Sequence, residues 1–173
     1  MAVEGYGLQD IKKELQHLNS AQLTELCLRL AKHKKENKEL VAYLLFVADD
    51  EEAFIEHSRY EVSMMFYLLP AQAYNAAKVL RKILRLITKF SRFSGSKNVE
   101  IRLLMGFCTN YLEYIDRKVG YKPLRTLFTR QIEKIDKLIS KLHEDLQGDY
   151  REEFNLLLEE ADKQLPWFSK SGY

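Results

Sequence analysis

Residues 76–93 read AAKVLRKILRLITKFSRF, and their apolar residues recur at steps of three and four. That spacing places the apolar side chains on one face of an α-helix, whereas a strand would need alternation at every second residue. At about 100° per residue the apolar face covers roughly half of the helix surface, which is wide enough to be buried against other helices. The stretch therefore predicts a long amphipathic helix that contributes to a helical core.

The other face of this helix is basic. The stretch contains six basic residues and no acidic residue, and on a helical wheel the six fall within a band about 100° wide. We call this set the basic stripe: Lys78, Arg81, Lys82, Arg85, Lys89 and Arg92. Like charges at this spacing destabilise a helix by a few tenths of a kcal/mol per pair, so we expect something to compensate them.

A second series of cations follows later in the chain at steps of four, three and four. Its members, which we call the extension of the basic stripe, are Arg130, Lys134, Lys137 and Lys141. Glu133, Asp136 and Glu144 lie nearby and compensate part of this charge. Both series are candidate binding residues, and the first is the stronger candidate because it contains no acidic residue.

Helical periodicity dominates the rest of the sequence and predicts eight helices. We expect them near residues 8–18, 20–34, 37–47, 51–69, 76–93, 98–119, 122–148 and 149–165. Asn19 or Ser20 with Gln22 forms a capping-box pattern, and Asp49 and Asp50 are expected to cap the fourth helix. Gly120 is expected to end the sixth helix, and Lys122-Pro123 to begin the seventh.

The fold class follows from these helices. We predict an all-α protein of antiparallel helical hairpins, arranged as an irregular α-solenoid or a layered bundle, with a compact bundle without repeats as the main alternative. The 173 residues fit a single domain over 1–173. Residues 1–19, a short helix, and the tail at 165–173 are expected to be appendages, with Trp167 and Phe168 docking the tail onto the domain or onto another copy.

The sequence also contains a weak internal similarity. Residues 37–46 and 98–107 both read N-x-E-[LI] and then F after five further residues, each follows an LRL, and residues 149–157 give a fainter third copy. The pattern resembles, in a generic way, HEAT-like helical repeats over residues 20–164, and no particular family is indicated. The resemblance implies stacked helix pairs, and it would place Arg29, Arg85 and Lys141 at equivalent positions. Chance similarity among leucine-rich amphipathic helices is the alternative.

Charge is unevenly distributed along the chain. Residues 1–61 carry a net charge of −4, residues 62–142 carry +11 and residues 143–173 carry −5, so the formal net charge of +2 conceals a basic middle. Three interpretations of the basic stripe remain open. It is solvated or neutralised by acidic residues within 49–52 or 144–162, or it binds a polyanion such as nucleic acid, or it binds an acidic protein or an anionic membrane surface.

Aromatic residues also recur at helical spacing. Tyr60, Tyr67 and Tyr74 are seven residues apart, and aromatic residues follow at 90, 93, 107, 111 and 114. Such residues are usually core, so we expect them to be buried; the alternative is that they stack on unpaired bases beside a basic groove.

The sequence shows no local sign of catalysis. The four histidines are scattered, Glu14 and His17 form the only E-x-x-H, and there is no Cys-x-x-Cys, glycine-rich phosphate loop or G-x-S-x-G. We therefore predict no catalytic residue, no metal ligand and no cofactor, although an active site assembled from distant residues stays an alternative. Cys27 and Cys108 both fall in apolar runs, where we expect reduced, buried side chains.

Location and function are inferred from these observations together. The first residues lack an apolar segment of signal-peptide length, and no stretch approaches eighteen uninterrupted apolar residues, so we expect a cytoplasmic protein without membrane insertion. The predicted function is a non-catalytic interaction module that uses the basic stripe to bind an acidic partner, either a protein or a polyanion. Nucleic-acid binding through phosphate contacts is the alternative.

Overall fold

The computed structural model describes residues 5–173, and this part of the chain is helical without strands. The helices are α1 (Leu8–Gln16), α2 (Ser20–His33), α3 (Lys35–Phe46), α4 (Glu51–Tyr67), α5 (Ala73–Ser94), α6 (Lys97–Tyr114), α7 (Lys122–Ile139) and α8 (Glu144–Gln164), followed by the 3₁₀ turn η1 (Lys170–Gly172). The predicted all-α class is confirmed. Within these residues, no helix combines the length and the apolar character needed to cross a lipid bilayer.

Contacts within the chain divide it into two compact units, with the boundary between Asp49 and Asp50. The predicted single domain stays a prediction, because this division describes contacts and does not measure folding. In the first unit α2 packs against α3, and neither α1 nor α2 contains a buried residue. This unit therefore has little apolar core of its own.

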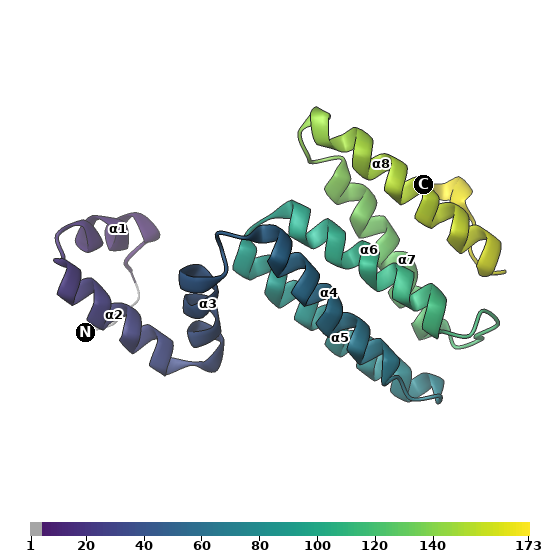
Figure 1. Cartoon of the computed structure of the whole chain (residues 1–173), viewed down its shortest axis with the longest axis horizontal. Helices are drawn as coiled ribbons and strands as arrows, with labels where there is room; N and C mark the ends of the chain where they lie inside the picture. The colour runs from purple at the N-terminus through teal and green to yellow at the C-terminus, as the bar shows by residue number, and fades with distance from the viewer. Residues whose placement is uncertain (1–4) are drawn as a thin grey trace. The chain divides into compact units, whose positions relative to one another are not determined.

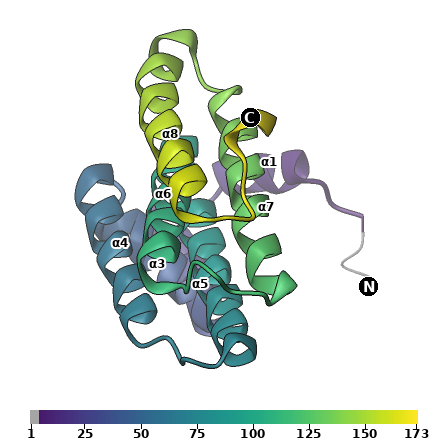
Figure 2. The same cartoon turned by 90° about the vertical axis from the view of Figure 1, so that its right-hand side faces the viewer.

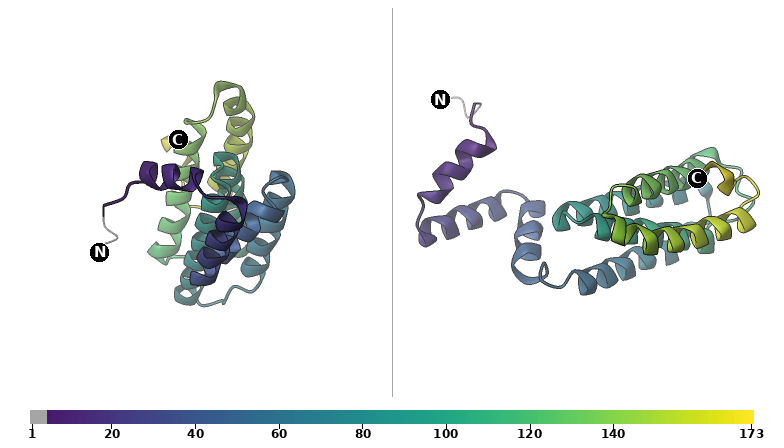
Figure 3. Two further views of the ribbon diagram at one scale, coloured as in Figure 1. Left: turned by 90° about the vertical axis from the view of Figure 1, so that its left-hand side faces the viewer. Right: turned by 90° about the horizontal axis from the view of Figure 1, so that it is seen from above.

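The second unit has two layers of helices (Figures 1 and 2). The first layer contains α4, α6 and α8 side by side, and the second contains α5 and α7. Helices of the same layer run in the same direction, since the chain alternates between the layers, and Figure 3 shows this unit from above. Such stacking fits an irregular solenoid and a layered bundle equally, so the repeat itself stays a prediction.

α6 is the centre of this unit because it packs against α4, α5, α7 and α8. Its buried residues extend around most of its circumference: Val99, Ile101, Leu103, Leu104, Met105, Gly106, Phe107, Cys108, Tyr111 and Leu112. Aromatic pairs join it to its neighbours, with the rings of Phe66 and Phe107 5.3 Å apart and those of Tyr111 and Phe128 4.9 Å apart. A helix that is apolar on nearly every side can be stable only in such an enclosed position.

Several helix ends follow the sequence signals. Asn19 and Gln22 form the expected capping box, in which each side chain accepts a hydrogen bond of 2.9 Å from the other residue's amide. Asp50 caps α4 by accepting from the amide of Ala53. Gly95 ends α5 with a φ of 64°, the left-handed conformation that favours glycine at this position.

Two predicted boundaries were wrong. α6 ends at Tyr114 rather than near residue 119, because the side chain of Asp116 accepts a hydrogen bond from the Lys118 amide and forms a turn that competes with the helix. The seventh helix ends at Ile139 and the eighth begins at Glu144, so Gly148 lies inside α8 instead of between the helices. The turn between them contains neither glycine nor proline, which is why the sequence did not reveal it.

The tail after α8 docks onto the second unit. Phe168 is buried, and its ring and that of Trp167 both lie edge-on to Phe128 of α7, at 5.5 Å and 6.0 Å. The guanidinium of Arg125 lies over the Trp167 ring, 5.4 Å from its centre. The tail therefore docks onto its own chain, which is one of the two expected arrangements.

Candidate functional site

α5 presents the basic stripe on the side opposite its packed face. The packed face consists of Ala76, Ala77, Leu80, Ile83, Ile87 and Phe90, all of which are buried. Lys78, Arg81, Lys82, Arg85 and Arg92 are exposed, and Lys89 is half-buried. Because burial of the apolar face fixes the rotation of the helix, it also fixes the outward direction of the cations.

The stripe has few partners within the fold. Across residues 5–173, no ion pair reaches Lys78, Arg81, Lys82, Arg85 or Arg92. The ammonium of Lys78 lies 4.3 Å from the centre of the Tyr74 ring. These cations are therefore largely solvated along a helix segment of about 20 Å.

Among the described residues, the extension on α7 and the turn that follows it contains both paired and unpaired cations. Arg130, Lys137 and Lys141 are exposed, whereas Lys134 is half-exposed and forms an ion pair with Glu100 of α6. Asp136, which was expected to compensate the extension, instead pairs with Arg151 of α8. The extension thus retains three cations without an ion pair in the described chain.

The basic stripe lies on α5, and its extension lies on the neighbouring α7 of the same layer and in the turn after it. α5 packs beside α7, and on each helix the cations lie opposite the buried residues, which on α7 are Leu124, Phe128, Ile132, Ile135 and Ile139. Packed helices are about 8–10 Å apart, so the two series form parallel tracks on the outer surface of the second layer. The sequence predicted the members of each track, and the fold brings the tracks together.

The acidic segments of the second unit have other partners. Arg102 of α6 pairs with Glu52, and Asn98 donates a hydrogen bond to Glu51. The hydrogen bond to Glu52 raises the pKa of the Arg102 guanidinium above its ordinary value. On α8, Glu159 pairs with Lys170 of the tail. Within the described residues, these contacts connect the acidic segments to α6 and to the tail rather than to the basic stripe.

A groove between α6 and α8 was not predicted from the sequence. It has a volume of about 1040 Å³ and lies between the second halves of the two helices, with the loop after α6 closing one end. Apolar side chains and four carboxylates line it, so its chemical character differs from that of the second layer. One signal was present: Leu156 follows Glu153 by three residues and precedes Glu160 by four, which places an apolar residue on an acidic face of α8.

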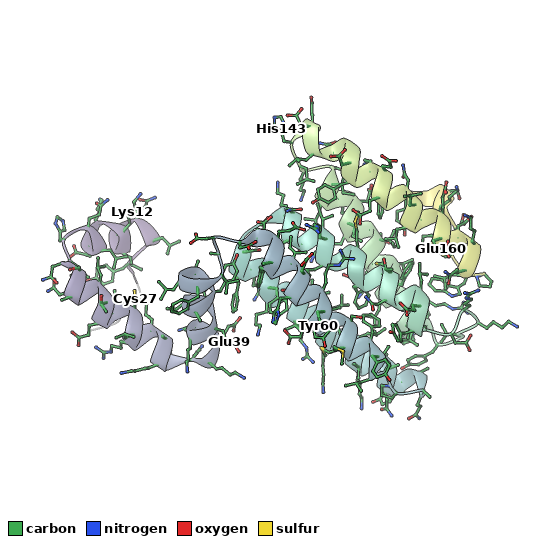
Figure 4. The ribbon with its side chains drawn as sticks, viewed as in Figure 1. Lys12, Cys27, Glu39, Tyr60, His143 and Glu160 are labelled. Atoms are coloured by element: carbon green, nitrogen blue, oxygen red, sulfur yellow. The ribbon has the colours of Figure 1, made fainter. Side chains whose placement is uncertain are left out.

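Some of the ionisable residues considered for catalysis lie in the first unit and others in the second. Cys108 is fully buried, as expected, and burial raises the pKa of its thiol far above the ordinary value. The expected burial of Cys27 was wrong, because that side chain is exposed. Glu14 and His17 are both exposed. His143 lies in the turn before α8 (Figure 4), with its Nδ1 3.1 Å from Asp145 Oδ2. Residues 5–173 contain no cluster of three or more side chains that could bind a metal ion.

The aromatic residues divide into two groups. Phe90, Phe107 and Tyr111 are buried, as predicted. Burial of the tyrosines spaced by seven was a wrong prediction, because Tyr60, Tyr67 and Tyr74 are 66%, 70% and 52% exposed. Tyr74 therefore belongs to the surface that carries the basic stripe.

Comparison of the chain with protein-family models, with curated proteins and with solved structures finds no match. The functions of the candidate surfaces are therefore inferred from the residues that form them.

Proposed function

We propose that this chain is a non-catalytic interaction module of the cytoplasm, which uses the basic stripe to bind an acidic partner, a protein or a polyanion. The observation that carries the proposal is the absence of ion pairs, within residues 5–173, at Arg81, Lys82, Arg85 and Arg92, all of which are exposed. The extension would lengthen the contact through Arg130, Lys137 and Lys141.

The energetics support a partner rather than internal neutralisation. Cations at steps of three and four repel one another along α5, and the carboxylates of residues 51 and 52 interact with α6 instead. A partner that brings anionic groups would replace this repulsion with attraction and would associate rapidly at low salt. Arg81, Lys82, Arg85 and Arg92 would therefore contribute to association more than to folding.

Nucleic acid is a second candidate partner, and one observation favours it. Tyr74 is 52% exposed at the start of α5, and the ammonium of Lys78 lies over its ring. An exposed aromatic ring next to a track of cations can stack on an unpaired base while the cations contact phosphates. Single-stranded RNA or DNA would fit this arrangement better than a duplex, whose bases are already stacked.

We also propose that α5–α6 and α7–α8 are two copies of one helix pair, as in HEAT-like repeats. Support comes from their arrangement, since α5 packs beside α7 and α6 packs beside α8. In this arrangement the two series of cations would occupy related positions on successive copies.

Fluorescence anisotropy tests the binding function. The labelled probes are a poly-glutamate peptide, a single-stranded RNA and a DNA duplex, each at 20 and about 150 mM salt. The test variant carries Arg81→Glu, Arg85→Glu and Arg92→Glu. A matched control carries Lys12→Glu, Lys34→Glu and Lys38→Glu, which change the net charge equally at exposed positions of the first unit.

We expect the chain to bind at least one probe, with affinity that falls steeply as salt increases, and we expect the test variant alone to lose this binding. Preference for RNA over poly-glutamate, together with a loss in Tyr74→Ala, would identify nucleic acid as the partner. Equal loss in the two triple variants would show that net charge rather than the stripe controls binding. Failure of all three probes to bind at low salt would contradict the proposal.

A further inference from the structure

The groove between α6 and α8 combines an apolar floor with an acidic rim. Met105, Leu112 and Leu157 form its floor and are nearly buried, whereas Leu156 is 62% exposed at its edge. Its volume of about 1040 Å³ is at the upper end of the range for small-molecule pockets, and the groove is partly open to solvent. These dimensions suit a segment of polypeptide better than a small molecule.

Four carboxylates surround the apolar floor: Glu113, Asp116, Glu153 and Glu160. Within the described chain none of the four forms an ion pair. They do have weaker partners: Gln164 donates a hydrogen bond to Glu160, the Lys118 amide donates one to Asp116, Tyr114 is hydrogen-bonded to Glu113, and Glu153 attracts Arg102. Arg117 and Lys118 lie at the end of the groove formed by the loop. The rim is therefore acidic along α8 and mixed only at one end.

The positions on α8 define the chemistry of a complementary ligand. Glu153, Leu156 and Glu160 occupy one face of the helix at steps of three and four, so an exposed leucine has a carboxylate about one turn away on each side. Figure 4 shows Glu160 in the second half of α8. The matching ligand would place an apolar side chain against Leu156 and a cation near each carboxylate.

We propose that the α6–α8 groove binds a basic amphipathic helix of a partner protein. Residues 153–164 of α8 extend for about 16 Å, which corresponds to roughly three turns of a bound helix. Leucine or methionine at steps of three and four would contact the floor, while lysine and arginine would reach the rim, as in other complexes of a helix in an apolar groove. The acidic rim therefore favours a basic helix over a neutral or acidic one.

A second copy of this chain fits the groove less well. Its α5 would bring the basic stripe, but the apolar residues of α5 are buried within its own unit. Cations without apolar side chains would leave the floor of the groove uncovered. A separate helix with both features accounts for the floor and the rim together.

This inference does not depend on the proposed function. The basic stripe faces outward from the second layer, whereas the groove lies between two helices of the first. A chain with both surfaces could hold an acidic partner and a basic partner at the same time. Loss of one interaction would leave the other intact, so the two can be tested separately.

The direct test uses labelled model peptides of fourteen residues in fluorescence anisotropy. One contains leucine and lysine arranged as an amphipathic helix, the second has the same composition scrambled, and the third replaces lysine with glutamate. We expect the amphipathic leucine–lysine peptide to bind at least tenfold more tightly than the scrambled peptide, and the glutamate peptide not to saturate. Equal affinity for the amphipathic and scrambled peptides would overturn recognition of a helix.

Variants then locate the binding site. The double variant Glu153→Lys and Glu160→Lys should weaken peptide binding at least tenfold, and Leu156→Ser should weaken it at high salt as well as at low salt. The matched control Glu144→Lys and Glu152→Lys makes the same charge change on exposed positions of α8 outside the groove, and it should bind as the parent chain does. Thermal melts followed by circular dichroism check that every variant is folded.

Three results would overturn the proposal. The first is equal loss in the groove variant and the matched control, and the second is loss in the Arg81, Arg85 and Arg92 variant instead. The third is a dimer, measured by light scattering, that is absent in the groove variant and persists when the peptide is added to the parent chain. A second copy would then occupy the groove.

Discussion

The side chain of Arg59 on α4 lies directly over Gly106 on α6. A Cβ at residue 106 would be 3.4 Å from Arg59 Nε, which is ordinary contact distance, and Arg59 is exposed and flexible. The site therefore has room for a methyl group.

We predict that Gly106→Ala stabilises the protein by about 0.5–1 kcal/mol, because alanine restricts the unfolded chain and favours a helix. Gly106→Leu should destabilise it by about 1–3 kcal/mol, since a large side chain would separate α4 from α6. Urea denaturation of both variants measures the difference. Destabilisation by alanine would show that α4 and α6 pack too closely to accept a methyl group at residue 106.

Ser58 of α4 is fully buried, and its hydroxyl has no hydrogen-bond partner among the described residues. A buried hydroxyl without a partner costs about 1–3 kcal/mol. Ser58→Ala should therefore leave stability unchanged or increase it by about 1 kcal/mol, measured by thermal and urea unfolding. Marked destabilisation would mean that the hydroxyl forms a bond in solution, and Ser63→Ala on the same helix, at a half-buried residue, serves as the comparison.

Repulsion within the basic stripe gives a prediction about salt. Lys82 lies four residues after Lys78 and three before Arg85, so Lys82→Glu replaces two repulsive pairs with attractive ones. We expect this variant to be about 0.5 kcal/mol more stable than the parent at low salt. The gain should disappear in 1 M salt, where charges are screened over about 3 Å. Lys82→Gln, which only removes the repulsion, should give roughly half of the gain.

Stability should decrease at alkaline pH because of two buried groups on α6. Burial raises the pKa of the Cys108 thiol above its ordinary value of 9.0 and that of the Tyr111 hydroxyl above 10.0. Both groups ionise more readily in the unfolded chain, so their contribution to stability is complete below about pH 8 and decreases progressively as pH rises above 9 and 10 toward the raised pKa values of the folded chain.

Urea titrations at pH 7, 8, 9 and 10 measure this effect. We expect Cys108→Ala to reduce the dependence on pH between 8 and 10, by up to about 1.4 kcal/mol per pH unit, although it is less stable than the parent at pH 7. Cys27→Ala, at an exposed position, is the matched control and should retain the parent's pH dependence. An unchanged slope in Cys108→Ala would exclude the buried thiol as the cause.

The docked tail provides a spectroscopic prediction. Trp167 is the single tryptophan, and its indole nitrogen is buried next to Phe128 and Arg125. Phe168→Ala removes a buried ring, so we expect a loss of about 3–5 kcal/mol if the tail unfolds with the helices. Red-shifted tryptophan emission at unchanged helicity would instead show that the tail detaches separately. Tyr173→Ala, which removes a half-exposed ring from the end of the tail, is the milder comparison.

Much of the fold could be predicted because helical periodicity is local. The span of α5, the caps at Asn19 and Asp50 and the proline at the start of α7 were visible in the sequence and are present in the structure. The turn between α7 and α8 was not, because residues 140–143 contain neither glycine nor proline to mark the interruption.

The candidate surfaces were predictable to a smaller extent. A helical wheel of α5 identified the basic stripe, because the face opposite the apolar residues is the one exposed to solvent. Which charged residues form ion pairs depends on contacts made by folding. The ion pair between Lys134 and Glu100, for example, has no signal in the sequence around either residue. The groove needs two helices that are far apart in the sequence, although the exposed position of Leu156 between Glu153 and Glu160 was already a clue.

The enclosed position of α6 has a consequence during protein synthesis. The helices that cover it on one side, α7 and α8, leave the ribosome only after it does. For that interval the nascent chain exposes an apolar helix, and such surfaces promote aggregation. A message that ended after residue 114 would make this state permanent, and its product would depend on chaperones or be degraded.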